Sequence, residues 1–350
     1  MKKCLSIILA VMLVMSLGAT AFAEPPANEI KAETPIDLTV TKAWKNSAGE
    51  KVPDELVPNE TLKFSVTPIS GPVAELPTIT VDDLATKTAD GATNYKTLMH
   101  IPSYSVLGCY KYEVREDPGS TQGVDYSKEV VHVEVWITNS ESGTGFAKNV
   151  YLKNEQGEKI NDKDCFTNIY NYSTPDGKYK NLIVDKLVEG NLANKEQDFK
   201  IKVTFTAEDG KTVQSPIDYG ENKILPGNWE NGTVSVVISN SHNSSAISFK
   251  NIPAGVKYEV AELDKHLVAD PTNNDPATGY EVRYEKNGTE VTKAEGDISE
   301  DAANKIDVIN KKGTAINTGV VLDSMPYVIM LVIAVAGVVL FTVKHRKAEE

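Results

Sequence analysis

Two sets of side chains in this sequence combine a lysine, a glutamate and an asparagine, in that order. The first set is Lys42, Glu116 and Asn168, and the second is Lys186, Glu262 and Asn310. Lysine and glutamate are 74 residues apart (116 − 42) in the first set and 76 (262 − 186) in the second; glutamate and asparagine are 52 (168 − 116) and 48 (310 − 262) apart. This agreement predicts two copies of one domain, joined near residues 172–178.

Each of these polar residues ends a short run that alternates apolar and polar side chains. The lysines close the patterns Leu-x-Val-x-Lys, the glutamates close Tyr-x-Val-x-Glu, and the asparagines follow apolar residues two positions earlier. Because residues two apart share a face of a strand, all six side chains should point into the cores of their domains. An unpaired buried charge costs several kcal/mol, so these groups must pair, shift their pKa or react.

Reaction is chemically possible because burial lowers the pKa of a lysine and raises that of a glutamate. A neutral amine is a nucleophile, and a protonated carboxyl group can polarise an amide and transfer protons. Attack on the asparagine amide would release ammonia and leave isopeptide bonds from Lys42 to Asn168 and from Lys186 to Asn310. Glu116 and Glu262 would assist. The alternative is an ion pair at a strand end beside a turn-forming asparagine, but the repetition favours the reaction.

The elements that position these residues should be strands. Alternating runs such as residues 62–66, 131–137 and 199–205 are separated by Gly, Pro, Asn and Asp, without long helical periodicity between them. This pattern predicts an all-β chain with two tandem β-sandwich domains, over residues 35–172 and 173–312.

Both ends of the 350-residue chain carry segments typical of export. Residues 1–23 have a basic start, an apolar core and Ala21-Phe22-Ala23, which indicates a signal peptide and a mature chain beginning at Glu24, with an N-terminal extension over 24–34. Residues 327–343 are apolar enough for a transmembrane helix. The basic tail at 344–350 should stay in the cytoplasm, which leaves the body of the protein outside.

Composition excludes several other functions. The formal net charge of −13 argues against binding to nucleic acid. The histidines are scattered without metal-ligand spacing, and no motif for a cofactor or for an enzyme acting on an external substrate is present. Strand parity points Cys109 and Cys165 outward from facing sheets, out of disulfide reach, so two free thiols are favoured while their pairing stays open.

At the two Lys–Glu–Asn sets the sequence resembles the major pilins of Gram-positive bacteria, in particular the two-domain streptococcal T-antigen type. The resemblance implies two tandem Ig-like domains of the Cna B type, each closed by an autocatalytic Lys–Asn bond with an assisting glutamate. It also implies a structural shaft subunit of a covalent pilus at the cell wall. Its partners would be a class C-type and a housekeeping sortase, other pilin subunits and a peptidoglycan precursor.

Sortase processing needs a sorting signal and an acceptor lysine. Thr318-Gly319, in the linker over residues 313–326, stands where the family has its sorting signal, although Asn317 replaces the usual proline; a flexible stalk before a membrane anchor is the alternative. Lys159 is our candidate for the pilin lysine, with Lys163 as its rival. A monomeric wall-anchored adhesin that binds a host protein or glycan would share these features, and polymerisation distinguishes the two.

Overall fold

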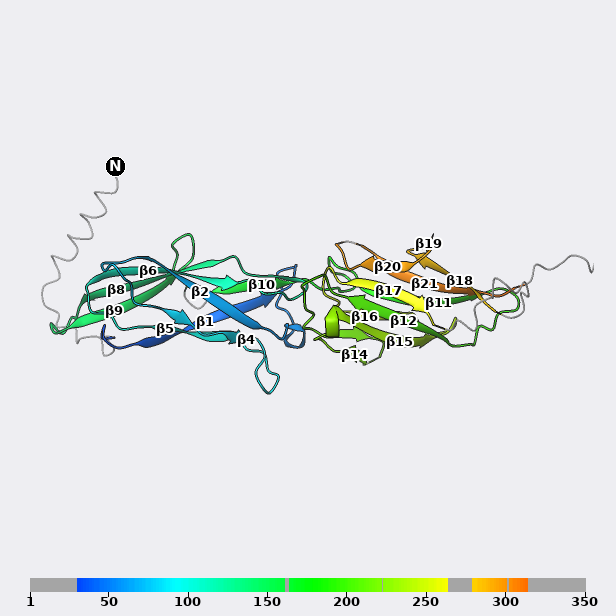
Figure 1. Cartoon of the computed structure of the whole chain (residues 1–350), viewed down its shortest axis with the longest axis horizontal. Coiled ribbons are helices and arrows are strands. Elements are labelled where there is room, and N and C mark those ends of the chain that lie inside the picture. Colours follow the sequence, from blue (N-terminus) through cyan, green and yellow to red (C-terminus); the bar gives the residue numbers. More distant parts are fainter. Residues whose placement is uncertain (1–29, 161–163, 222, 264–278, 301, 314–350) are drawn as a thin grey trace, which may run out of the picture.

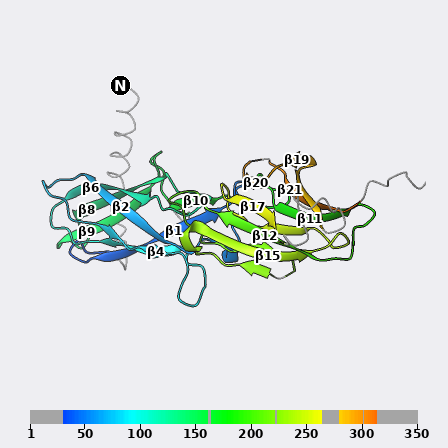
Figure 2. The same cartoon turned by 45° about the vertical axis from the view of Figure 1, so that its right-hand side comes forward.

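The computed structural model describes residues 30–160, 164–221, 223–263, 279–300 and 302–313. These residues form strands and two short 3-10 turns, Asp54–Leu56 and Glu230–Gly232, with no α-helix among them. The predicted all-β fold is confirmed. Two β-sandwiches follow one another along the chain and lie end to end along its long axis (Figures 1 and 2).

The first sandwich consists of two five-stranded sheets, ordered β3-β5-β1-β10-β7 and β4-β2-β6-β8-β9. Its strands are β1 (Ile36–Lys45), β2 (Thr61–Ser70), β3 (Thr80–Val81), β4 (Leu84–Ala85), β5 (Lys96–Ile101), β6 (Gly108–Asp117), β7 (Val124–Asp125), β8 (Val130–Asn139), β9 (Phe146–Lys153) and β10 (Phe166–Tyr170).

The second sandwich pairs a seven-stranded sheet, ordered β14-β13-β16-β11-β21-β18-β19, with a four-stranded sheet, β15-β12-β17-β20. Its strands are β11 (Leu182–Glu189), β12 (Phe199–Thr206), β13 (Ile217–Tyr219), β14 (Lys223–Leu225), β15 (Thr233–Asn240), β16 (Ile247–Lys250), β17 (Lys257–Glu262), β18 (Glu281–Lys286), β19 (Thr289–Val291), β20 (Ala294–Asp297) and β21 (Asn304–Lys311).

The first and last long strands of each sandwich are neighbours and run parallel. In the first sandwich β1 pairs with β10, and Lys42 lies opposite Phe166. In the second, β11 pairs with β21, and Lys186 lies opposite Val308. In both, the asparagine is therefore two residues beyond the partner of the lysine. Since residues two apart share a face, this register puts amine and amide side by side in the core.

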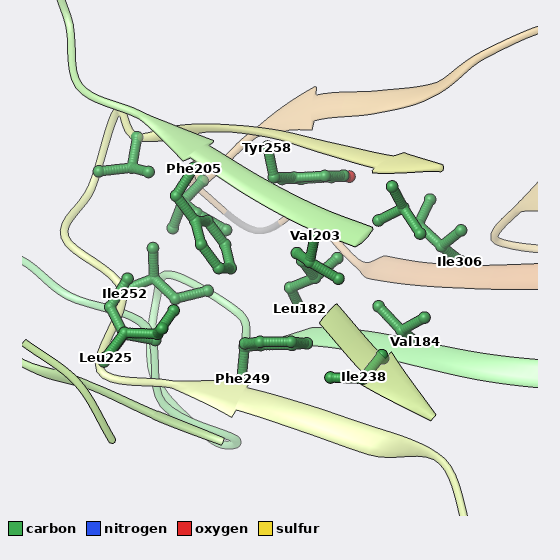
Figure 3. Close-up of a cluster of buried hydrophobic side chains, with 14 of the residues drawn as sticks. Leu182, Val184, Val203, Phe205, Leu225, Ile238, Phe249, Ile252, Tyr258 and Ile306 are labelled. Atoms are coloured by element: carbon green, nitrogen blue, oxygen red, sulfur yellow. The ribbon is translucent and has the colours of Figure 1, made fainter. Parts of the chain in front are cut away.

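Each core is filled by the alternating residues of both sheets. Val131, Val133, Val135 and Ile137 of β8 are all buried, and so are Phe199, Ile201, Val203 and Phe205 of β12. Figure 3 shows Val203, Phe205 and Phe249 pointing into the space between the sheets of the second sandwich.

The prediction that Cys165 points away from the core is wrong. Cys165 is only 5% exposed and belongs to the apolar cluster of the first sandwich. It precedes β10, and strand parity does not apply before the strand begins. The prediction of free thiols is confirmed, because neither Cys109 nor Cys165 forms a disulfide.

Main-chain hydrogen bonds join the two sandwiches at their junction. Ser173 donates to the carbonyl of Ile252 at 2.8 Å, and Ala254 donates to the carbonyl of Asn171 at 2.9 Å. The side-chain amide of Gln122 also spans the junction. Its Nε2 donates to the carbonyl oxygen of Ala254 at 2.6 Å, and its Oε1 accepts from the N–H of Glu208 at 3.1 Å. The segment after β10 is thus bound to the second sandwich before β11 begins.

Several predicted segments lie outside the described residues. These are the signal peptide (1–23), part of the extension (24–29), most of the linker (314–326) with Thr318 and Gly319, the expected span (327–343), the basic tail (344–350) and Lys163. In the part of the chain that the structure covers, no helix is long and apolar enough to cross a bilayer.

We predict that Gly123→Ala will destabilise the first sandwich at this junction. Gly123 has a φ of +78°, and a Cβ there would lie 2.5 Å from the carbonyl oxygen of Asn171. Gly49 is the matched control, because its φ is +82° but nothing lies within 4 Å of its Cβ position. Gly49→Ala should cost roughly 1–2 kcal/mol for the left-handed backbone alone. Thermal melting should show a larger loss for Gly123→Ala; equal losses would contradict the close packing.

Candidate functional site

The structure brings the first set of predicted residues into direct contact. Lys42 Nζ lies 2.5 Å from Glu116 Oε2 and 2.5 Å from Asn168 Oδ1. Lys42 comes from β1, Asn168 from the neighbouring β10, and Glu116 from β6 in the facing sheet. Their exposed fractions are 2%, 0% and 6%, so the contact lies in the interior, as parity predicted.

The surroundings of Lys42 make its amine a better nucleophile. Burial lowers the pKa of Lys42 from 10.5 to about 8, while the negative charge of Glu116 opposes this shift. Trp44, fully buried on the same strand, places its ring centroid 5.8 Å from Nζ. At neutral pH an appreciable fraction of the amine is therefore unprotonated, in a site where an apolar ring excludes water.

The amide of Asn168 is held in one orientation. The backbone N–H of Ser127 donates to Asn168 Oδ1 at 2.7 Å. A backbone N–H can only donate, so the amide oxygen, and not its nitrogen, must face Ser127. Asn168 Nδ2 and Glu116 Oε1 are both buried without a hydrogen-bond partner among the described residues. The amide nitrogen therefore has no hydrogen bond to break when it leaves, and one oxygen of the Glu116 carboxyl group is available to exchange a proton.

A second carboxyl group near this site was not predicted. Glu60 accepts hydrogen bonds from Thr121 Oγ1 at 2.8 Å and from the Tyr126 hydroxyl at 2.7 Å. Burial raises the pKa of Glu60, and the charge of Glu116 raises it further. Glu60 lies just before β2 and two residues before Leu62, so the alternating run at 62–66, extended one step back, would have placed it on the core face.

The second set is also buried between the two sheets of its sandwich, but the distances between its side chains are longer. Lys186 Nζ lies 3.3 Å from Glu262 Oε2 and 3.3 Å from the carbonyl oxygen of Val308. Asn310 Nδ2 donates to Glu262 Oε1 at 3.5 Å. Lys186 and Asn310 are fully buried, and the ring centroid of Phe199 lies 4.4 Å from the amine. Here Glu262 contacts both Lys186 and Asn310, whereas in the first set Lys42 contacts both Glu116 and Asn168.

Lys159, the candidate acceptor, lies apart from both sets on the surface of the first sandwich. It is exposed in the segment after β9, where its backbone forms an isolated antiparallel β-bridge with that of Lys153 and its Nζ lies 4.3 Å from the ring centroid of Tyr151. A cleft of about 390 Å³ beside it is lined by Glu129, Glu155 and Asp164 among others. The amine is accessible to another protein.

These observations define a class of protein: tandem β-sandwiches whose first and last strands each contribute one partner of a buried lysine–asparagine pair, with a carboxyl group from the facing sheet. Comparison with known proteins agrees. Residues 38–171 match a family described as a Spy0128-like isopeptide containing domain. Residues 180–312 match a domain family of unknown function, DUF7601.

Similarity to individual proteins extends over nearly the whole chain. A protein named Pilin, from Streptococcus pyogenes serotype M1, is 24% identical over 362 residues, which cover 96% of this chain and 98% of that protein. A solved mutant of the major pilin from Streptococcus pyogenes has a TM-score of 0.50 at 19% identity, covering 79% of this chain and 99% of that one. That structure supports the fold alone. The resemblance to Gram-positive major pilins is confirmed.

We predict that the lowered pKa of Lys42 can be measured directly in Asn168→Ala, which has no amide to attack. The Cε resonance of Lys42 should titrate near pH 8 because burial disfavours the charged amine. Adding Glu116→Gln should move the midpoint lower still, since the charge that opposes the shift is removed. A midpoint at the ordinary 10.5 would contradict a buried amine.

Proposed function

We propose that this chain is the shaft subunit of a covalent pilus on the surface of a Gram-positive bacterium, with both sandwiches closed by intramolecular isopeptide bonds. The observation that carries the proposal is the buried contact of Lys42 with both Glu116 and Asn168. The similarity to streptococcal pilins supports the role of pilus subunit. For the second bond the support is the geometry of Lys186, Glu262 and Asn310, because the matching domain family has no known function.

The proposed reaction is a transamidation. The neutral amine of Lys42 attacks Cγ of Asn168, and the C–Nδ2 bond breaks. The amine loses one proton and Nδ2 gains one, so that nitrogen leaves as ammonia and the product is a secondary amide. Glu116 can carry this proton, since it contacts the amine and has an oxygen without a partner among the described residues. An open cleft of about 1200 Å³ is lined in part by Glu116 and Ser127, so the ammonia would have only a short distance to cross before it reaches solvent.

The reaction should depend on pH through the amine. With a pKa of about 8 for Lys42, the neutral fraction rises about tenfold for each pH unit below 8 and levels off above it. Holding the two groups in contact also replaces a bimolecular encounter, which is worth roughly 7–11 kcal/mol of the barrier.

Assembly would use the remaining predicted features. A class C-type sortase would cleave after Thr318 and transfer the threonine carbonyl to Lys159 of the next subunit, and the housekeeping sortase would attach the completed pilus to a peptidoglycan precursor. The signal peptide and the span at 327–343 would deliver the chain to the outer face of the membrane.

We predict that residues 24–312 will have a mass lower than their sequence requires by two ammonia molecules. Lys42→Ala should restore one of them, because one bond is lost. Its melting temperature should fall, since a cross-link across a loop of about 100 residues is worth roughly 4–5 kcal/mol by analogy with a disulfide. Lys45→Ala, at the exposed end of the same strand, is the control and should keep both bonds. An unchanged wild-type mass would reject the internal bonds.

We also predict a ladder of covalent oligomers on denaturing gels when the full chain is produced with its sortase. Lys159→Arg keeps the positive charge but offers no acceptor amine, so it should abolish the ladder. If the ladder persists in Lys159→Arg and disappears in Lys163→Arg, the rival lysine is the acceptor. Wild-type protein that reaches the wall only as a monomer would favour an adhesin over a shaft subunit.

A further inference from the structure

The backbone N–H of Ser127 lies at the atom of Asn168 where charge develops during the proposed reaction. When the amine attacks, Cγ becomes tetrahedral and Oδ1 takes up negative charge. Preorganised donors 2.7–3.1 Å from such an oxygen stabilise the transition state, most strongly where water is excluded. Ser127 N lies 2.7 Å from Oδ1, and the exposed fractions of Ser127 and Asn168 are 9% and 0%.

We propose that the Ser127 N–H is the oxyanion donor for the bond between Lys42 and Asn168. This inference rests on the proposed function, because it assigns a catalytic group to the same reaction. Ser127 gives up no proton in the step: its N–H donates to the tetrahedral oxyanion. When ammonia leaves and the C=O bond reforms, the same N–H donates to the carbonyl of the new amide.

A turn fastened to β10 aims this N–H. Glu129 N donates to Ser127 Oγ at 3.3 Å, and Ser127 Oγ donates to Glu129 Oε2 at 3.0 Å. The same carboxylate accepts the N–H of Thr167 at 2.8 Å. Thr167 immediately precedes Asn168, so the turn and the amide share one hydrogen-bonded support. Glu129 is therefore a positioning residue, which acts through Ser127.

The second site does not show this donor. Asn310 Oδ1 is buried and has no hydrogen-bond partner within the described ranges, while Asn310 Nδ2 faces Glu262. The assistance from a main-chain N–H is thus assigned to the first bond. The second bond, in the same chain, becomes an internal control for expression and recovery.

The test removes the N–H while keeping the chain otherwise intact. Ser127→Pro lacks the donor, and Ser127→Ala retains it but lacks the hydroxyl. The full chain of each variant is expressed, and proteolysis with mass spectrometry follows the peptides that join Lys42 to Asn168 and Lys186 to Asn310 over time. Loss of one oxyanion donor should slow the first bond on the order of 10²-fold in Ser127→Pro. The second bond should form at close to the wild-type rate in both variants. Ser127→Ala keeps the N–H but loses the hydroxyl contacts with Glu129, so it should slow the first bond far less than Ser127→Pro does.

Glu129→Ala provides a second test that does not require proline in the turn. The negative charge of Glu129 raises the pKa of Lys42, so removing that charge alone would speed formation of the first bond. Slower formation would instead report a misplaced donor, and Glu129→Gln, which can still accept from Thr167, should restore the rate. If Ser127→Pro forms the first bond at the wild-type rate, the oxyanion role is overturned. If the proline variant does not fold, an undiminished rate in Glu129→Ala overturns it. Absence of both cross-links in wild-type protein would instead reject the proposed function.

Discussion

The parallel pairing of the first and last long strands is the constraint on which both sites depend. It sets the lysine of one strand beside the asparagine of the other, two residues further along, in both sandwiches. A shift of one residue would turn one of these side chains to the opposite face. The apolar residues around each pair fix that register, because Val40 and Phe166 in the first sandwich must stay in the core together with Lys42. Packing of the core and placement of the reactive groups are therefore the same requirement.

The same packing explains why charged groups are tolerated in the interior. A lysine that cannot reach water would cost several kcal/mol if it were left alone. Lys42 instead meets a carboxyl group and an amide oxygen, and burial shifts its pKa toward the neutral form. In the proposed product neither Lys42 nor Lys186 carries a charge. The folded but unreacted chain would thus be a strained precursor, relieved by the chemistry that its own core promotes.

Most of this arrangement could be predicted from sequence because strand parity and repetition are simple signals. Both Lys–Glu–Asn sets lie buried as the alternating runs indicated, and the lysine and asparagine strands are the first and last of their sandwiches. What parity could not predict comes from outside regular strands. Ser127 contributes a main-chain group, whose role no residue type reveals. The prediction for Cys165 was wrong for the same reason, because Cys165 lies before β10 begins.

The hydrogen-bonded junction between the sandwiches has a consequence for a filament built from such subunits. The segment leaving β10 is bound to the second sandwich through Asn171 and Ser173, and Gln122 reaches across to Ala254 and Glu208. If a free linker connected the two sandwiches, they would move independently of each other, and thermal motion would bend the filament within each subunit as well as between subunits. Here the two sandwiches are joined by paired main chain, so in such a filament bending would be concentrated at the contacts between subunits. The stiffness of the fibre would then be set by one joint per subunit instead of two.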